Sequence, residues 1–185
     1  MIISLSGVAG SGKSTVAEMV CKKLNLKEYN IGQIRRDLAK ERGMTLEEYN
    51  KLGEKDPTTD YIADDFVKRL GREEDNFLIQ SRTAYHFIPN SVKVFLNVDI
   101  DEAARRRIKD IKDENLRKQR NEAKADTIKE VKKLILEREE SDRKRYLKYY
   151  NIDYKDMKNY DLVVDTTKKT PSEVIEEIVN FVRKK

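Results

Sequence analysis

The sequence has a single cysteine, Cys21, and lacks a basic segment ahead of its first apolar residues. One cysteine excludes an internal disulfide and is typical of a protein from a reducing compartment. The first apolar run, residues 1–6, is too short to be a signal peptide or to span a membrane. These shortages predict a soluble, cytoplasmic protein that has no membrane partner.

Apolar residues are also few: they make up 38% of the 185 residues, whereas charged residues make up 39% and leave a net charge of +5. This is lean but sufficient for the core of one domain. The positive charge suits a partner that carries phosphate, such as a nucleotide or a nucleic acid. Helices with solvated faces of lysine and glutamate explain the composition equally well, so charge alone does not decide.

Short apolar stretches alternate with segments of helical periodicity. The stretches predict strands at 1–6, 29–31, 76–80, 91–99 and 160–166. The periodic segments predict helices at 14–24, 32–42, 45–54, 59–71, 101–150 with one break, and 171–185. In the third of these helices Thr45 is the expected cap, with Glu48 three residues on. This alternation predicts an α/β fold with a five-stranded parallel sheet and helices on both faces.

The chain is expected to form a single domain, 1–185, from which two segments project. The sheet and its covering helices would use 1–30, 73–108 and 127–185. The first projecting segment, 31–72, is helical. The second, 109–126, has almost no apolar residues, so it can bury little surface.

The stretch "GVAGSGKS" (7–14) matches the phosphate-binding pattern G-x-x-x-x-G-K-[ST], and it lies between a predicted strand and a predicted helix. Glycines let successive backbone N–H groups point into one concavity, and the following helix adds its positive N-terminus. Lys13 would reach the β- and γ-phosphates, and the Ser14 hydroxyl would bind Mg²⁺. The sequence therefore predicts an ATP or GTP site with Mg²⁺, formed by Gly7, Val8, Ala9, Gly10, Ser11, Gly12, Lys13, Ser14 and Thr15.

Two classes of phosphate-binding protein fit poorly. A GTPase needs Asn-Lys-x-Asp to read guanine, and the nearest string, "NKLG" at 50–53, lacks the aspartate. A motor ATPase usually has an acidic pair at the end of a strand, where this chain has Gln80 and Ser81. Small kinases need only the phosphate site, a second pocket for the acceptor, and a flap with arginines, which is the layout predicted here.

The chain resembles the P-loop nucleoside monophosphate kinases, and most closely the cytidylate kinase family in its short archaeal-type form. Five segments carry the resemblance together with the phosphate site: "IGQIRR" (31–36), "ERGMTLEEYNKLGEKDPTTD" (41–60), "QSRTAYHFIP" (80–89), "EREESDRKRYLKYYNID" (137–153) and "YDLVVDTT" (160–167). It implies transfer of the γ-phosphate of ATP to CMP or dCMP, giving CDP or dCDP. It also implies a monomer with no stable nucleic-acid partner, an acceptor-binding insertion at 31–72 and a lid at 109–126.

The resemblance implies roles for charged residues far apart in the sequence. Arg36 and Arg82 would hold the acceptor phosphate, with Arg35 competing for the role of Arg36. Residues that share one helical face with Val131 and Ile135 would contact the phosphate, ribose and base of CMP: Arg138, Asp142 and Arg145. A surface ladder of ion pairs is the alternative explanation of this face.

Catalytic arginines are expected in the lid, where Arg117 and Arg120 would neutralise the transferring phosphoryl group, with Arg107 at the base of the lid. Asp165 and Thr166 would border the adenine of ATP. Gln80 stands where relatives have an acidic residue that orients the waters of Mg²⁺. Since an amide cannot supply charge, we expect either low turnover or replacement of this group by Asp99.

Two other functions remain open from the sequence. One is a P-loop kinase for another acceptor, such as AMP, UMP or a small metabolite. The other is a weakly catalytic ATP-binding protein or RNA-associated ATPase, which Gln80 and the basic balance favour. RNA affinity that falls steeply with salt would identify the second.

Overall fold

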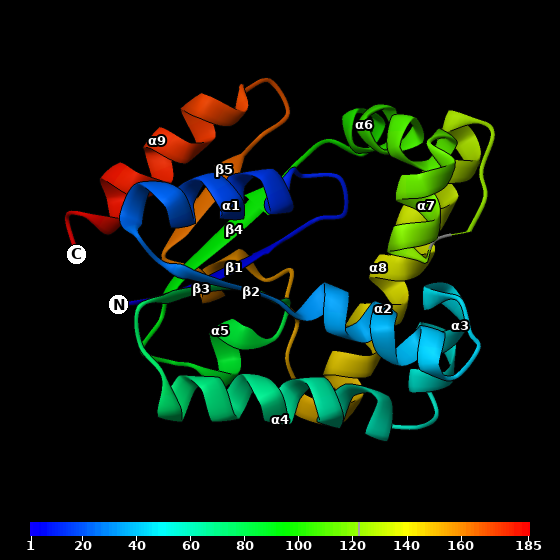
Figure 1. The fold of residues 1–185 in the computed structure, drawn as a ribbon, viewed down its shortest axis with the longest axis horizontal. Coiled ribbons are helices and arrows are strands. Elements are labelled where there is room, and N and C mark those ends of the chain that lie inside the picture. The colour runs from blue at the N-terminus through cyan, green and yellow to red at the C-terminus, as the bar shows by residue number, and fades with distance from the viewer. Residues whose placement is uncertain (122) are drawn as a thin grey trace.

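A parallel sheet of five strands forms the centre of the computed structural model, which describes residues 1–121 and 123–185 (Figure 1). The strands, in the spatial order β2-β3-β1-β4-β5, are β2 (Lys27–Asn30), β3 (Phe77–Gln80), β1 (Ile2–Gly7), β4 (Val92–Asn97) and β5 (Leu162–Asp165). All residues of the central β1 are buried. The prediction of a five-stranded parallel sheet is confirmed.

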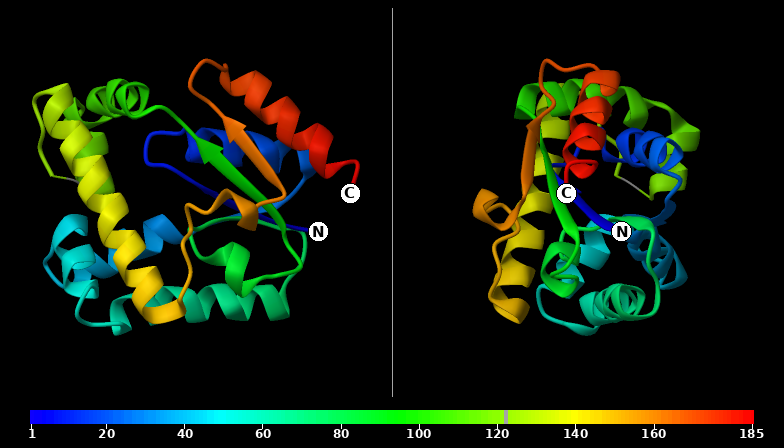
Figure 2. Two further views of the ribbon diagram at one scale, coloured as in Figure 1. Left: turned by 180° about the vertical axis from the view of Figure 1, so that it is seen from behind. Right: turned by 90° about the vertical axis from the view of Figure 1, so that its left-hand side faces the viewer.

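One face of the sheet is covered by α1 (Lys13–Leu24) and α9 (Pro171–Val182), which lie side by side in the views of Figures 1 and 2. Alternate strand residues point to this face, as expected for a pleated sheet. The strand residues that pack with the two helices are Ile3, Leu5, Leu78, Val94, Leu96 and Val164. Thr170 and Glu173 form a capping box that starts α9.

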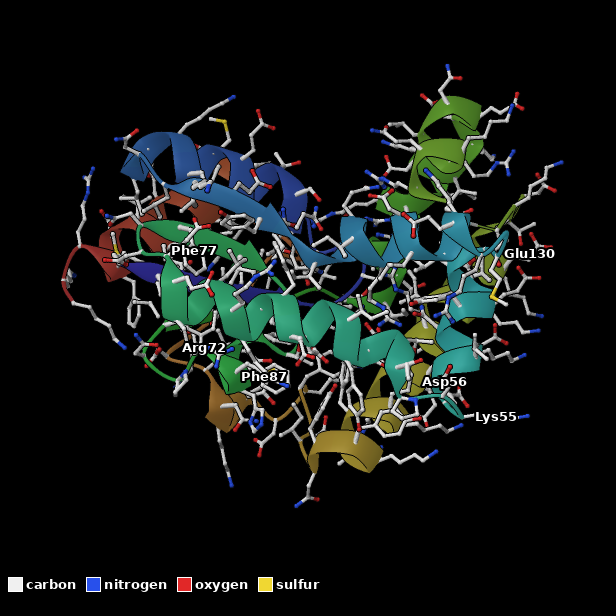
Figure 3. The ribbon with its side chains drawn as sticks, turned by 60° about the horizontal axis from the view of Figure 1, so that its bottom comes forward. Lys55, Asp56, Arg72, Phe77, Phe87 and Glu130 are labelled. Carbon is white, nitrogen blue, oxygen red and sulfur yellow. The ribbon has the colours of Figure 1, made fainter. Side chains whose placement is uncertain are left out.

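The opposite face is covered by α4 (Thr58–Glu73), α5 (Ala84–Phe87) and α8 (Ile128–Tyr150). Figure 3 follows α4 from the turn at Asp56 to Arg72, with Phe87 of α5 beside it. The buried residues of α4 that pack on the sheet are Ala63, Val67 and Leu70. Helices on both faces agree with the prediction from the sequence.

The segment 31–72 forms α2 (Ile31–Glu41) and α3 (Leu46–Gly53) beyond the carboxyl end of β2, and α4 then runs back beneath the sheet (Figure 1). The predicted cap of α3 is confirmed: the Thr45 hydroxyl accepts from the backbone N–H of Glu48, and the Glu48 side chain accepts from the N–H of Thr45. The segment therefore begins immediately at the edge of the sheet where the parallel strands end.

The prediction of one break in 101–150 is wrong, because the structure has two. The region forms α6 (Ile100–Lys112), α7 (Glu114–Arg120) and α8. Asp113 is extended, and its carboxylate accepts from two backbone N–H groups of α7, so a short polar residue both ends one helix and starts the next. The expected lid, 109–126, includes residue 122, which lies outside the described residues.

None of the helices in the part of the chain that is described combines the length and apolarity needed to cross a bilayer.

Candidate active site

A cleft of about 640 Å³ lies at the carboxyl edge of the sheet. The loop after β1 forms one wall; α2, α4 and α8 form the other, while α6 and α7 close one side. Open α/β sheets bind ligands at this edge. The cleft therefore brings together segments from nearly the whole length of the chain.

The loop between β1 and α1 has the backbone of a phosphate cradle. Gly7 has φ of 148°, and a Cβ there would lie 2.4 Å from the carbonyl oxygen of Leu96. Gly12 has φ of 85° at the N-cap of α1. Such conformations strain any residue that has a side chain, so these positions require glycine. The loop thus directs its backbone toward the cleft at the positive end of α1.

Lys13 lies inside this cradle. Its Nζ donates to the carbonyl oxygens of Gly7 at 2.9 Å and Val8 at 2.7 Å. Burial, and then the positive charges of Arg82 and Arg138, lower the pKa of Lys13 well below its ordinary value. An anion in the cleft would relieve this accumulation of positive charge. Ser14 and Thr15 line the cleft beside Lys13.

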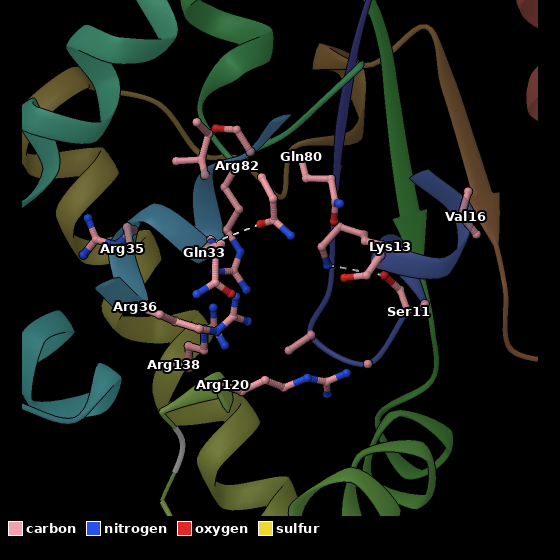
Figure 4. Close-up of a pocket in the computed structure, with 18 of the residues that line it drawn as sticks. Ser11, Lys13, Val16, Gln33, Arg35, Arg36, Gln80, Arg82, Arg120 and Arg138 are labelled. Atoms are coloured by element: carbon pink, nitrogen blue, oxygen red, sulfur yellow. Dashed lines mark hydrogen bonds between the residues drawn. The ribbon is translucent and has the colours of Figure 1, made fainter. Parts of the chain in front are cut away.

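Three arginines from distant segments face the cradle. Figure 4 shows Arg36 of α2, Arg82 after β3 and Arg138 of α8 side by side, across the cleft from Lys13. Burial, and then the charge of Arg82, lower the pKa of Arg138 to about 10. Arg35, the competing candidate, points away from this cluster (Figure 4). The structure thus brings together the sequence-predicted residues Lys13, Arg36, Arg82 and Arg138.

Asp142 lines the cleft and orients Arg82. Its carboxylate pairs with Arg82 and also with Arg145. Burial raises the pKa of Asp142, but the charges of Arg82 and Arg145 outweigh burial and lower it to about 2. The guanidinium of Arg82 also lies 5.3 Å from the ring centroid of Tyr154. Arg82 is therefore held on two sides while it faces the cleft.

Arg145 lies beneath the cleft wall and does not line the cleft. It is fully buried and pairs with Asp60 of α4 as well as with Asp142. Arg35 pairs with the same Asp60 at 2.8 Å, and its Nη2 donates to Asn50 of α3. This buried network joins α2, α3, α4 and α8 and occupies the guanidinium of Arg145. The direct contact with CMP expected for Arg145 stays a prediction.

The two lid arginines lie in different places. Arg120 lines the cleft, where it pairs with Asp110 of α6. Arg117 lines a smaller hollow on the outer side of α7, together with Lys112 and Lys124. The segment 109–126 contacts the segment 31–72, since the backbone N–H of Leu46 donates to the carbonyl oxygen of Asn121 at 3.2 Å.

Thr166 lines the cleft at the end of β5, but Asp165 does not. The carboxylate of Asp165 instead accepts from the backbone and hydroxyl of Thr167. Arg106, which the sequence analysis missed, also lines the cleft and donates to the carbonyl oxygen of Thr166 at 2.8 Å. Arg107, expected at the base of the lid, lines the cleft beside it.

Gln80 ends β3 inside the cleft, where its Nε2 donates to Oε1 of Glu28 at 2.7 Å. Asp99, expected as its substitute, does not line the cleft. The Asp99 carboxylate instead accepts from the backbone N–H groups of Asp101 and Glu102 at the start of α6. Replacement of Gln80 by Asp99 is therefore a wrong prediction, because Asp99 caps a helix.

The lining of the cleft is compatible with hydrated Mg²⁺ that enters together with a nucleotide. Among residues 1–121 and 123–185, no cluster of three histidine, cysteine or acidic side chains could bind a metal ion. Mg²⁺ usually keeps several waters and binds through one or two protein oxygens and the phosphates of the substrate. The Ser14 hydroxyl and the Gln80 side-chain oxygen fit this requirement.

A five-stranded parallel sheet, a glycine-rich loop between β1 and α1, and a lysine that faces converging arginines define a P-loop kinase. Comparison with known proteins narrows this class. The chain belongs to the cytidylate kinase-like family, whose model matches residues 2–168. The family expected from the sequence is thus confirmed.

Curated relatives match nearly the full length of the chain. A cytidylate kinase of Sulfurisphaera tokodaii is 37% identical, with 98% of this chain and 96% of the relative covered. A cytidylate kinase of Methanocella arvoryzae is 35% identical, with 100% and 99% covered.

Solved structures support the fold. An uncharacterized protein from Eubacterium ventriosum matches with a TM-score of 0.72 at 17% identity, covering 100% of this chain and 99% of the other. Shikimate kinase from Aquifex aeolicus matches with a TM-score of 0.58 at 23% identity, covering 99% and 96%.

Proposed function

We propose that the chain is a (d)CMP kinase, which transfers the γ-phosphate of ATP to CMP or dCMP and releases ADP and CDP or dCDP. Membership of the cytidylate kinase-like family supports this reaction. The observation that carries it is the cluster of Arg36, Arg82 and Arg138 across one cleft from Lys13 (Figure 4). Two polyanionic ligands can meet there with their phosphates together.

The cradle would bind the phosphates of ATP through the backbone of residues 7–14 and through Lys13. Thr166 and Asp165 would border the adenine, and Thr166 is the better placed of the two because it lines the cleft. Ser14 and Gln80 would hold Mg²⁺, which supplies neutralisation of the phosphate charge when it is bound. Lys13 would then exchange its bonds to loop carbonyls for bonds to phosphate oxygens.

The acceptor phosphate would bind to the guanidinium groups of Arg36, Arg82 and Arg138, whose planar forks match phosphate oxygens. Asp142 would keep Arg82 oriented and contact the ribose of CMP. Arg145 would act through Asp142, since burial separates it from the cleft. We keep 31–72 as the acceptor-binding insertion and 109–126 as the lid, both as proposals.

Transfer would be in line: an oxygen of the acceptor phosphate forms the new bond to the γ-phosphorus, and the bond to the β–γ bridging oxygen breaks. No side chain has to take a proton, because the attacking atom is already anionic. Positioning and electrostatics would supply the catalysis. Of the two lid arginines, Arg120 is better placed to neutralise the transferring group, because it lines the cleft and Arg117 does not.

An acceptor panel tests this function. Purified protein is given saturating MgATP with CMP, dCMP, UMP, AMP or no acceptor, and ADP formation is measured in a coupled assay. We expect the highest kcat/KM with CMP or dCMP and a low background without acceptor. ADP formation that no acceptor stimulates would overturn the proposal and favour an ATPase, while a preference for AMP or UMP would correct the acceptor.

The RNA-associated ATPase is not favoured, because the chain matches cytidylate kinases over nearly its full length. We further propose that the chain works as a monomer without a stable nucleic-acid partner. The described walls of the cleft come from one chain, so a second copy is not needed to complete it. A molar mass near 21.7 kDa in solution would agree with this proposal.

A further inference from the structure

Gln80 has a side-chain amide of fixed orientation. In the sheet register Gln80 pairs with Leu5 of β1 and Asn30 of β2, and its side chain lines the cleft. Its Nε2 donates to Glu28 at 2.7 Å. A carboxylate only accepts hydrogen bonds, so the amide turns its NH₂ group toward Glu28. The oxygen of the amide, Oε1, is therefore the atom that Gln80 presents on its other side.

Glu28 reaches Gln80 from behind the cleft. It precedes Asn30 by two residues in β2, so the two side chains project from the same face of the sheet. Burial and the nearby Glu28 carboxylate raise the pKa of the Cys21 thiol to about 11, which agrees with a position of Glu28 close to α1. Glu28 is exposed, because β2 is an edge strand. Glu28 itself does not line the cleft. The NH₂ group of Gln80 thus points away from the cleft, and Oε1 points into it.

The acidic side chains that line the described cleft all have protein partners. Asp60 pairs with Arg35, and Asp64 accepts from the hydroxyls of Thr83 and Tyr150. The carboxylates of Asp110 and Asp142 are paired with Arg120 and Arg82. Figure 4 shows the Gln80 amide pointing toward Lys13, on the cradle side of the cleft. A cation that accompanied ATP to Ser14 would meet mostly positive side chains, and Oε1 of Gln80 is an uncharged oxygen on the same side.

We propose that Glu28 is a positioning residue that fixes the amide of Gln80 with its oxygen toward the Mg²⁺ that accompanies ATP. This inference rests on the proposed function, because it requires MgATP as a ligand. Without Glu28 the amide is as able to present its NH₂ group, which repels a cation. The carboxylate also polarises the amide, which strengthens Oε1 as an acceptor. Gln80 thus supplies the oxygen, and Glu28 fixes the direction in which this oxygen points.

Glu28→Gln tests the inference, since two amides can pair in either orientation and the bias is lost. ATP binding is measured by calorimetry in EDTA and across a Mg²⁺ titration. We expect the Kd for ATP in EDTA to stay within about twofold of the wild type. The Mg²⁺ concentration that produces half of the increase in ATP affinity should rise about tenfold, as is typical when a residue that supports a metal ligand is removed. Glu18→Gln, an exposed change in α1, is the control and should alter neither value.

The exchanged pair, Gln80→Glu with Glu28→Gln, sharpens the test. It places the carboxylate on the cleft side and the amide behind it, so we expect a Mg²⁺ requirement within about twofold of the wild type. This variant also decides the question if Glu28→Gln alone does not fold.

Three outcomes separate the inference from the proposed function. A wild-type Mg²⁺ requirement in Glu28→Gln would overturn the inference, as would an equal loss of ATP affinity with and without Mg²⁺, because that indicates a structural role. A wild-type protein that binds no ATP would instead overturn the proposed function.

Discussion

The two sides of the cleft are built in different ways. The cradle side is a single stretch, residues 7–14, and its geometry comes from backbone conformation. The acceptor side consists of side chains from α2, α8 and the end of β3, and buried carboxylates hold some of them in place. One side is thus local in sequence, and the other depends on the whole fold.

Lys13 and Arg82 differ in how their positive charge is balanced. Lys13 has neutral carbonyl partners, and its pKa is lowered by burial and by neighbouring arginines. Burial also lowers the pKa of Arg82, but the Asp142 carboxylate outweighs it and raises that pKa above its ordinary value. The charge of Lys13 therefore needs a bound anion to balance it, whereas the charge of Arg82 is already balanced by the Asp142 carboxylate.

Lys13→Ala should have the largest effect. We expect turnover to fall by about 10³-fold, because one charge that stabilises the transferring phosphate is lost. The protein should unfold at the same or a higher temperature, because a buried cation with a lowered pKa has been removed. Coupled ADP assays and thermal unfolding measure the two quantities.

The matched control is Lys23→Ala, an exposed lysine in the same helix, which should leave both quantities unchanged. Normal turnover in Lys13→Ala would contradict the assignment of the cradle. A large fall in its unfolding temperature would show that the charge of Lys13 is balanced within the protein, as that of Arg82 is.

Arg145→Leu should affect stability first. The change leaves Asp60 and Asp142 as buried carboxylates with less compensation, so we expect the free energy of unfolding to fall by about 3 kcal/mol. Urea unfolding measures this quantity. Arg143→Ala, an exposed change on the same helix, should have little effect. Unchanged stability of Arg145→Leu would mean that the network does not hold the acceptor side together.

The local side of the cleft was predictable, and the non-local side was predictable only in part. The pattern in 7–14 and the capping pair Thr45 and Glu48 depend on spacings of a few residues, which the sequence displays directly. The pair of Gln80 with Glu28 spans 52 residues, and that of Arg145 with Asp60 spans 85. Such contacts leave no periodic signal, because they form only when the helices and strands pack.

The resemblance to a family supplied the arginines of the acceptor side, but it did not tell which of them lie in the cleft. Arg138 and Arg145 share one helical face, yet only Arg138 lines the cleft. The reason is the position of α4, whose Asp60 meets the second arginine in the core. Periodicity predicts which face of a helix is turned inward, and the neighbouring helix decides how deep each residue lies.

Arg138→Ala and Arg82→Ala should separate binding from stability. Each change removes charge-assisted bonds to the acceptor phosphate, so we expect the KM for CMP to rise about tenfold or more with little change in the KM for ATP. Arg82→Ala should also destabilise the fold, because Asp142 loses a partner. Steady-state kinetics and urea unfolding on both variants test the pair. Equal stability losses would contradict the distinction between them.

Asp64→Asn should have the smallest effect, and it tests whether every carboxylate on the acceptor side is stabilised by arginines. Asp64 accepts from the hydroxyls of Thr83 and Tyr150. Burial outweighs these bonds and raises the pKa of Asp64 to about 6, whereas that of Asp142 is lowered to about 2. The environment of Asp64 thus favours the protonated form more than water does, whereas that of Asp142 favours the ionised form.

The direction of the pH effect follows from proton binding. Between about pH 4 and pH 6 the folded protein holds a proton on Asp64 that the unfolded chain has released, so this group contributes less stability as the pH rises. Asp64→Asn removes that slope. We expect its free energy of unfolding, relative to the wild type, to rise by about 1–2 kcal/mol from pH 4 to pH 7.

Urea unfolding at several pH values gives this difference, and Asp65→Asn, the exposed neighbour, is the control. Tyr150→Phe should act in the opposite direction. It removes a hydrogen bond that favours the ionised carboxylate, so the pKa of Asp64 rises further. The loss of stability with pH then extends to higher pH and becomes larger in total. Parallel pH profiles for the wild type and Asp64→Asn would mean that the pKa of Asp64 is the same in the folded and unfolded protein, which would contradict the effect of burial on this carboxylate.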